Sequence, residues 1–315
     1  MERILIIGCS GQIGSELTLA LRKVYGNEHV FATDIKQPAT DITESGPFQI
    51  LNVLDYDALL NFVQKNNITQ VYNLAAILSG NAEKNPLGSW DINMKALMNT
   101  LEVARLTNAK RLFWPSSIAV FGPTTPRNNT PQLCVMEPNT VYGISKLAGE
   151  RWGEYYFNKY GVDFRSVRYP GLISYKTEAG GGTTDYAVEI YYEAIRNKSY
   201  KCFLKEDSAL PMMFMEDAIN ATIKLMQVDS ENLSLRSSYN VGGMSFTPKQ
   251  VAEAIKKYIP EFTITYEPDF RQAIADSWPA SIDDSVARND WGLNDKYNID
   301  SMTKVMLKEI AKKLQ

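Results

Sequence analysis

The sequence predicts an α/β fold, in which a doubly wound parallel sheet is followed by a smaller C-terminal lobe. Strand-length runs rich in β-branched residues alternate with helix-period segments through the first half of the chain, and this alternation is typical of βαβ units. The 315 residues slightly exceed what one hydrophobic core usually supports, which favours a second lobe. Glycines directly after the first strand run indicate a tight turn into a helix.

The periodicity of the apolar residues predicts the individual elements. Short apolar runs predict strands at 3–8, 29–35, 70–76, 111–117 and 164–170. Apolar residues at helical spacing predict helices at 15–26, 57–66, 89–108 and near 143–159. Because a helix stands between successive strands, we expect right-handed crossovers and parallel strand pairing.

The strand–helix rhythm breaks after Gly171. Residues 174–185 are rich in glycine, threonine and charge, and shorter elements with scattered prolines follow. We therefore expect one domain from 1–171 plus about 209–242, with the latter returning to the main sheet. A second lobe is expected from about 172–208 plus 243–315.

Composition excludes several classes of function. The formal charge is −3 without a run of five like charges, so neither nucleic acid nor an anionic membrane is expected as a partner. No apolar run is long enough for a membrane helix and no leader peptide is recognised. Three scattered cysteines (Cys9, Cys134, Cys202) favour a reduced, cytoplasmic protein. With His29 as the single histidine, neither a Ser-His-Asp triad nor a metal site is expected.

A glycine-rich loop, GCSGQIG at 8–14, joins the first strand to the first helix. Glycines at 8, 11 and 14 allow close approach of a pyrophosphate to the helix N-terminus, as in a Rossmann-type dinucleotide site. Asp34 ends the second strand, 20 residues after Gly14. A carboxylate there accepts hydrogen bonds from a ribose diol and repels a 2′-phosphate, so NAD is favoured over NADP.

The second half of the predicted sheet carries a candidate catalytic group. Tyr142 and Lys146 are four residues apart, on one face at the start of a helix. A nearby ammonium is expected to stabilise the tyrosine phenolate as a base, and Ser117 can hold a substrate hydroxyl. A second pair with this spacing, Tyr155 and Lys159, is interpreted as a surface or dimer-face pair.

GCSGQIG, Asp34, NLAA at 73–76, SSIAVFG at 116–122 and YGISK at 142–146 together resemble the extended short-chain dehydrogenase/reductase superfamily over the whole chain. The resemblance implies an NAD-binding domain and a substrate-binding lobe with the limits given above. It implies Ser117, Tyr142 and Lys146 as the catalytic residues. It implies that NAD is bound by Gly8, Gly11, Gln12, Ile13, Gly14, Asp34, Ile35, Asn52, Val53, Leu74, Ala75, Ala76, Asn93, Tyr142, Lys146 and Leu172, with Asn93 supporting the lysine through water.

Longer motifs in the second lobe narrow the resemblance. The stretches at 168–194, 210–218, 244–248, 272–279 and 283–292 resemble the short-chain type L-threonine 3-dehydrogenases. This implies oxidation of L-threonine by NAD at the β-carbon to L-2-amino-3-oxobutanoate, in threonine catabolism to glycine or aminoacetone. It also implies functional coupling to a 2-amino-3-ketobutyrate CoA ligase.

The loop GGGTTDYA at 180–187 is the expected binding site of the substrate carboxylate. Backbone N–H groups of a glycine-rich nest and two threonine hydroxyls can hold a small zwitterion without a bulky cation. The expected substrate-binding residues are Ser79, Ser117, Tyr142, Gly182, Thr183, Thr184 and Trp278. The loop can instead be a hinge between lobes, and Trp278 can equally be a core residue.

Two other functions stay open from the sequence. One is a nucleotide-sugar epimerase or dehydratase on the same fold, and the other is a non-catalytic NAD-sensing protein. Wide apolar faces near 90–106 and 143–159 (Ile92, Leu97, Met98, Leu101; Leu147, Trp152, Tyr155, Tyr156) are similar to the helices that pair in family dimers, so a homodimer is expected, although burial within one chain is the alternative.

Overall fold

The computed structural model describes residues 2–178, 180 and 182–315. The chain divides into two compact units, and each is described by itself. The first comprises residues 1–117, 140–168 and 219–239, and the second comprises 118–139, 169–218 and 240–315.

The first unit is built on a six-stranded sheet in the order β3-β2-β1-β4-β5-β7. All five strand pairs are parallel, which confirms the predicted fold class. The strands are β1 (Ile4–Ile7), β2 (Val30–Asp34), β3 (Phe48–Ile50), β4 (Gln70–Asn73), β5 (Arg111–Phe113) and β7 (Phe164–Arg165). Every residue of β1 is at most 1% exposed, as expected for a central strand covered on both faces.

The strand order places a switch point between β1 and β4. The chain runs outward from β1 to β3, then returns to β4 and runs outward to β7. Right-handed crossovers therefore put the first helices on one face of the sheet and the later ones on the other. The helices of this unit are α1 (Gln12–Tyr25), α2 (Thr40–Glu44), α3 (Tyr56–Lys65), α4 (Ser79–Ala82), α5 (Pro86–Thr107) and α6 (Val141–Tyr160), with short 3₁₀ helices η1 (Asn27–His29) and η3 (Ser230–Asn232).

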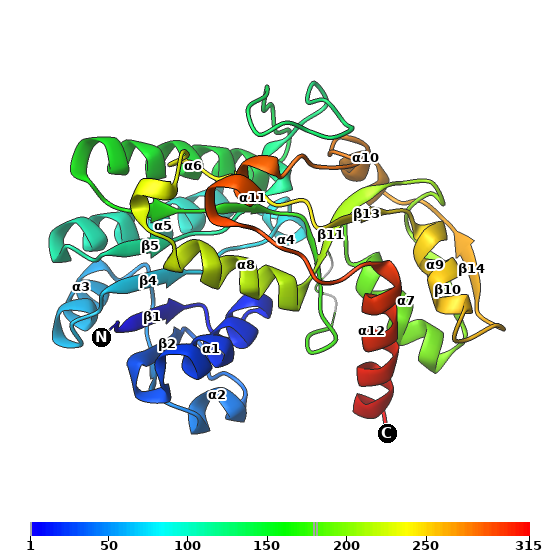
Figure 1. Ribbon diagram of the computed structural model, residues 1–315, viewed down its shortest axis with the longest axis horizontal. Coiled ribbons are helices and arrows are strands. Elements are labelled where there is room, and N and C mark those ends of the chain that lie inside the picture. Colours follow the sequence, from blue (N-terminus) through cyan, green and yellow to red (C-terminus); the bar gives the residue numbers. More distant parts are fainter. Residues whose placement is uncertain (1, 179, 181) are drawn as a thin grey trace. The chain divides into compact units, whose positions relative to one another are not determined.

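Local sequence signals set the helix ends. The side chains of Asp55, Asn85 and Thr140 accept hydrogen bonds from first-turn N–H groups of α3, α5 and α6, respectively. Gly161, with φ +72°, ends α6 in the left-handed conformation. Figure 1 shows α5 and α6 lying side by side.

Glycines let α6 approach the sheet closely. A Cβ atom at Gly149 would overlap the indole of Trp114, and one at Gly153 would overlap the ring of Phe164. Trp114 and Phe164 belong to the apolar core between the sheet, α3 and α5. The rings of Trp114 and Phe164 therefore pack directly against the backbone of α6 at these two glycines and position the helix that carries Tyr142.

The second unit contains two small sheets, β10-β14 and β13-β11-β9. Its strands are β9 (Gly171–Ile173), β10 (Ser199–Cys202), β11 (Leu210–Phe214), β13 (Met244–Phe246) and β14 (Thr263–Tyr266), and its helices are η2 (Ile118–Val120), α7 (Tyr186–Arg196), α9 (Pro248–Lys256), α10 (Arg271–Asp276), α11 (Ser285–Trp291) and α12 (Ile299–Lys313). A further short sheet has the order β12-β8-β6, with β6 (Ser116–Ser117), β8 (Val167–Tyr169) and β12 (Tyr239–Asn240).

The expectation that residues 209–242 return to the main sheet is wrong for their first strand. β11 pairs with β9 and β13 rather than with the six-stranded sheet, because residues 244–246 supply it with an antiparallel partner. Most of helix α8 (Met215–Gln227) and the following residues to 239 do belong to the first unit.

Among the described residues, no helix combines the length and apolar character needed to cross a membrane.

We predict that Gly153→Ala lowers the free energy of unfolding by about 1–3 kcal/mol, because the added methyl group must displace the Phe164 ring. Urea denaturation measures this change. Gly180→Ala is the matched control, since a Cβ there meets no atom within 4 Å. Equal midpoints for the two variants would contradict the close packing of α6.

Candidate active site

The loop after β1 has the geometry of a phosphate cradle. Gly8 has φ +88°, and a Cβ atom there would lie 3.0 Å from the backbone nitrogen of Ala75. A Cβ at Gly14 would overlap the carbonyl oxygen of Gly8. Gly11 is the N-cap of α1 without a side-chain cap, and no acidic residue stands in the first turn, which holds Gln12 and Ile13. The N-terminal N–H groups of α1 therefore remain available to an anion.

Asp34 lies beside this loop. The carboxylate is buried and accepts hydrogen bonds from the backbone N–H of Ser10 at 2.9 Å and of Lys36 at 3.2 Å. The Ser10 hydroxyl oxygen is buried and has no hydrogen-bond partner among the described residues. The Asp34 carboxylate, an acceptor for a ribose diol, and the Ser10 hydroxyl thus lie next to the phosphate cradle. These residues fit a dinucleotide.

The other predicted cofactor residues follow the ends of neighbouring strands. The Asn52 side chain accepts the N–H of Leu54 at 3.0 Å, and Val53 is buried. Leu74, Ala75 and Ala76 are half-buried directly after β4, and Ile35 is 69% exposed directly after β2. Because carboxyl ends of parallel strands share one edge, these groups lie at the edge where ligands bind in such sheets.

Asn93, on α5, is buried and pairs with the backbone of Ile77. Its side-chain oxygen accepts the Ile77 N–H at 2.8 Å and its amide donates to the Ile77 carbonyl at 3.1 Å. Asn93 therefore holds the chain just before Ser79, which begins α4. Its expected support of Lys146 through water stays a prediction.

Ser117, Tyr142 and Lys146 come together at the start of α6. The Tyr142 phenol is hydrogen bonded to the Ser117 hydroxyl. The Lys146 Nζ donates to the carbonyl oxygen of Pro115 at 2.6 Å and lies 4.1 Å from the centre of the Trp114 ring and 5.4 Å from that of Tyr142. The side chain of Lys146 is thus buried in a fixed position between its helix and the chain that carries Ser117.

Burial dominates the electrostatics of this group. It raises the pKa of Tyr142 to about 12, although the hydrogen bond to Ser117 acts in the opposite direction. It lowers the pKa of Lys146 to about 7, while attraction to Glu150 opposes that change. Removal from water disfavours both charged forms, so burial sets the direction of both pKa changes in the chain alone. The expected lowering of the tyrosine pKa by the Lys146 ammonium stays a prediction.

Tyr155 and Lys159 lie elsewhere on α6. Lys159 donates to the Tyr155 hydroxyl at 2.6 Å, and the pair is exposed. The pair has the same spacing as Tyr142 and Lys146 but is exposed, which agrees with its interpretation as a surface pair.

The expected substrate loop lies in the second unit. Residue 181 of this loop and residue 179, just before it, lie outside the described residues. The Asp185 carboxylate accepts hydrogen bonds from the backbone N–H groups of Gly180 at 2.8 Å and Gly182 at 2.7 Å. Two of the amides expected to bind a substrate carboxylate are thus already occupied by a carboxylate of the chain itself.

The remaining predicted residues of the second unit are mostly buried. Thr183 is 4% exposed, and a Cβ atom at Gly171 would lie 2.7 Å from the Cβ of Thr184. Leu172 is half-buried in β9 and pairs with Met213 of β11. Trp278 is 5% exposed, which is the burial expected of a core tryptophan.

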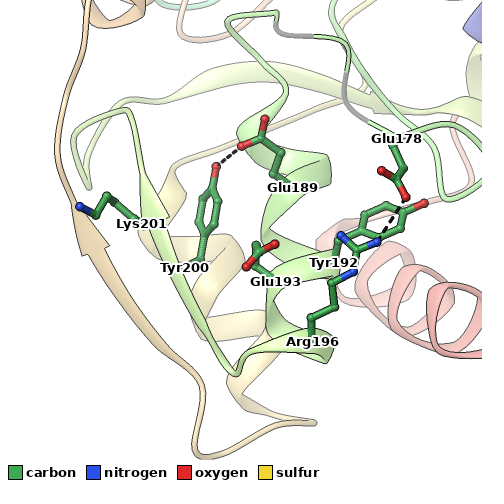
Figure 2. A pocket seen from close by; sticks show the side chains of 7 residues that line it. All are labelled: Glu178, Glu189, Tyr192, Glu193, Arg196, Tyr200 and Lys201. Atoms are coloured by element: carbon green, nitrogen blue, oxygen red, sulfur yellow. Dashed lines mark hydrogen bonds and ion pairs between the residues drawn. The ribbon is translucent and has the colours of Figure 1, made fainter. Parts of the chain in front are cut away.

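A separate cavity of about 440 Å³ lies in the second unit, and none of the predicted site residues lines it. Figure 2 shows its carboxylates turned toward neighbouring side chains. Tyr200 donates to Glu189 at 2.8 Å, and Arg196 pairs with Glu178 at 3.3 Å. Its charges are therefore largely satisfied within the chain.

No group of three His, Cys, Asp or Glu side chains able to hold a metal ion occurs in the part of the chain that the structure describes.

Sequence reasoning missed two buried polar residues that shape the first unit. Asn73, at the end of β4, donates to the Ala96 carbonyl at 3.2 Å and to the Thr100 hydroxyl at 3.1 Å. Glu150, one turn after Lys146, is fully buried against Arg168. Glu150 could have been found as a charged residue four positions after the lysine, on the same helix face.

We predict that Gly14→Ala weakens NAD binding about tenfold or more, because its methyl group must displace the Gly8 carbonyl that shapes the cradle. Isothermal titration calorimetry with NAD measures the loss, and a thermal melt checks that the variant is folded. Gly180→Ala is the matched control, since its Cβ would meet no atom within 4 Å and Gly180 is not among the expected cofactor residues. Similar affinities of a folded Gly14→Ala variant and the control would contradict this placement of the cofactor.

Comparison with known proteins agrees with this geometry. A model of the NAD dependent epimerase/dehydratase family matches residues 4–242. An uncharacterized epimerase/dehydratase of Staphylococcus haemolyticus is 51% identical over 317 residues, covering 100% of this chain and 99% of that protein.

Two solved structures resemble the whole chain. The GalE-like L-threonine dehydrogenase of Cupriavidus necator in its holo form is 56% identical, with a TM-score of 0.95, covering 97% of this chain and 99% of that one. A monomeric L-threonine 3-dehydrogenase from a metagenome, in its apo form, is 44% identical with a TM-score of 0.95, covering 99% of this chain and 100% of that one. The resemblance stated from the motifs is confirmed: the chain is an enzyme that belongs to the NAD dependent epimerase/dehydratase family, and NAD is its cofactor.

Proposed function

We propose that the protein is an NAD-dependent L-threonine 3-dehydrogenase. It oxidises the β-carbon hydroxyl of L-threonine to the ketone of L-2-amino-3-oxobutanoate and yields NADH and a proton. The observation that carries the proposal is the hydrogen-bonded Ser117–Tyr142 pair next to buried Lys146, in a chain similar over its length to solved L-threonine dehydrogenases.

The three side chains have distinct roles in this mechanism. Tyr142, as phenolate, removes the proton of the substrate hydroxyl, and Ser117 holds that hydroxyl in line. NAD, when bound, accepts the hydride from the β-carbon. Lys146 supplies the positive charge that stabilises the phenolate and donates to the nicotinamide ribose. Since Tyr142 has a pKa of about 12 in the chain alone, this charge is needed near neutral pH.

The first unit is proposed as the NAD-binding domain and the second as the main substrate-binding lobe. The cofactor cradle at Gly8, Gly11 and Gly14 supports the first assignment, since close backbone contacts at Gly8 and Gly14 leave no room for side chains there. Asn52, Val53, Leu74–Ala76, Asn93 and Leu172 are proposed to complete the cofactor site.

Ser79, Gly182, Thr183, Thr184 and Trp278 are proposed to bind the amino acid together with Ser117 and Tyr142. Because the Asp185 carboxylate holds the N–H groups of Gly180 and Gly182, a substrate carboxylate either displaces Asp185 or relies on the threonine hydroxyls. A carboxylate bound by N–H and O–H donors needs no cation beside it.

The product sets the reactions that follow. A β-keto acid with an α-amino group loses CO₂ readily to give aminoacetone, or is cleaved by a CoA-dependent ligase to glycine and acetyl-CoA. We propose a place in threonine catabolism with coupling to such a ligase.

A reducing, cytoplasmic setting is proposed from the three scattered cysteines. Two of them, Cys9 and Cys202, are buried thiols, and burial raises the pKa of each to about 11.

We predict rapid NADH formation from NAD with L-threonine, and little with D-threonine, L-allo-threonine or L-serine, or when NADP replaces NAD. Tyr142→Phe should lower kcat about 10²–10⁴-fold while NAD affinity is retained, because the base is removed and the ring is kept. Absorbance of NADH measures turnover. Tyr155→Phe, which alters the exposed tyrosine–lysine pair, is the matched control with normal turnover.

Two results would count against this function. Near-normal turnover by Tyr142→Phe would remove the tyrosine from the mechanism. Silence of the wild-type protein on all four amino acids, with NAD binding intact, would redirect attention to nucleotide sugars.

A homodimer is proposed from the exposed apolar residues of α5 and α6. Ile92, Trp152 and Tyr155 are 38%, 40% and 43% exposed. In contrast, Leu97, Leu101 and Tyr156, expected on the same faces, are buried within the unit. The first group forms an apolar surface on adjacent helices, as a two-fold interface requires. The solved metagenome relative is described as monomeric, so the oligomeric state needs direct measurement.

We predict that Trp152→Glu converts a dimer to a monomer, because the substitution places a charge within the apolar face. Light scattering coupled to size exclusion measures the mass. Leu133→Glu is the control, since Leu133 is 79% exposed outside these helices and should leave the mass unchanged. A wild-type protein that is monomeric at micromolar concentration contradicts the dimer.

A further inference from the structure

A buried ion pair lies one helical turn beyond Lys146. Glu150 and Arg168 are 0% and 2% exposed, respectively. The Arg168 guanidinium donates to both carboxylate oxygens, from Nε at 3.0 Å and from Nη2 at 2.8 Å. Two-point pairing of this kind fixes orientation as well as distance. The carboxylate of Glu150 is therefore held rigidly inside the first unit.

The same carboxylate binds the residue next to the catalytic serine. The Ser116 hydroxyl donates to Glu150 at 2.6 Å. On the other side of Ser116, the Pro115 carbonyl accepts the hydrogen bond from Lys146 at 2.6 Å. Two consecutive residues before Ser117 are thus tied to two side chains one turn apart on α6, and these bonds fix the position of Ser117 relative to Tyr142.

Few charged groups face Lys146. Tyr142 and Glu150 come from its own helix, and Trp114 and Pro115 come from the segment after β5. Arg168, on β8, reaches this region through Glu150. At the N-terminus of α6, Glu83 accepts the backbone N–H of Val141 at 2.9 Å. Attraction to the Glu150 carboxylate raises the pKa of Lys146 against the effect of burial.

We propose that Glu150 is a positioning residue for the catalytic group. It holds the segment that carries Ser117 on α6 through the hydroxyl of Ser116, and it keeps Lys146 in its ammonium form. Arg168 sets how much of the Glu150 charge Lys146 experiences. The inference rests on the proposed roles of Ser117, Tyr142 and Lys146. A positioning role differs from that of a purely structural ion pair, because it predicts opposite shifts of the Lys146 protonation midpoint for the loss of Glu150 and the loss of Arg168.

The test uses three variants of the full-length protein. Glu150→Gln removes the negative charge and leaves Arg168, so the protonation midpoint of Lys146 should fall by about one pH unit. Arg168→Gln leaves the carboxylate with one fewer cation, so the midpoint should rise by a similar amount. The double variant Glu150→Gln/Arg168→Gln restores neutrality, so its midpoint should return toward that of the wild type. NMR of ¹³C-labelled lysine, assigned with Lys146→Met, measures the midpoint without substrate.

Kinetics provide a second readout. At neutral pH, kcat with L-threonine should fall about tenfold in Glu150→Gln while the KM for NAD is unchanged, and the double variant should recover most of the loss. Ser116→Ala should lower kcat, whereas Ser166→Ala should not. Ser166 is a matched control because its hydroxyl is buried in a 2.9 Å hydrogen bond with that of Ser238, away from the serine–glutamate link.

The outcomes distinguish the proposed role of Glu150 from the proposed oxidation of L-threonine. Opposite shifts of the Lys146 midpoint in the two single variants support the positioning role, whether or not L-threonine is the substrate. Shifts of the same sign, or none, together with a general loss of stability would overturn it and leave the ion pair as structural. If either single variant does not fold, Ser116→Ala decides, since a folded Ser116→Ala variant with normal kcat contradicts the proposal.

Discussion

A parallel sheet must be covered on both faces, and this constraint determines where the candidate active site forms. β1 is fully buried between β2 and β4, so the connecting helices lie on both sides of the sheet. Right-handed crossovers then create a switch point where the chain reverses its direction of winding. The glycine loop, Asp34 and the residues after β4 all follow strand ends at this edge.

Burial also controls the chemistry of the catalytic group. Tyr142 and Lys146 are both driven toward their neutral forms by loss of water. Hydrogen bonds to Ser117 and Pro115 fix their positions but supply little charge. In this environment a single internal carboxylate has a large influence, because charge interactions are strong where water is excluded. The Glu150–Arg168 pair is thus close enough to matter for reactivity as well as for packing.

The second unit shows how a loop of small residues can be organised before a ligand binds. The Asp185 carboxylate takes two glycine N–H groups of the expected anion site. Sequence alone identified those N–H groups as donors but not their internal acceptor, because the distance between Asp185 and the glycines depends on how the loop folds. Thr183 of the same loop is buried, and Thr184 lies against Gly171.

The fold class, five of the six strands of the main sheet, the glycine-rich turn after β1 and the family could be predicted from the sequence, whereas the short edge strand β3 (Phe48–Ile50) was missed. Periodicity, helix caps and glycine spacing act over short stretches of chain, so they need no knowledge of distant contacts. The tertiary structure alone decided that β11 leaves the main sheet, that burial outweighs the hydrogen bond to Ser117 in setting the pKa of Tyr142, and that Glu150 joins Ser116 and Arg168. Each of these depends on residues far apart in sequence that meet in the core, where neighbours and loss of water, rather than residue type, determine charge and pairing.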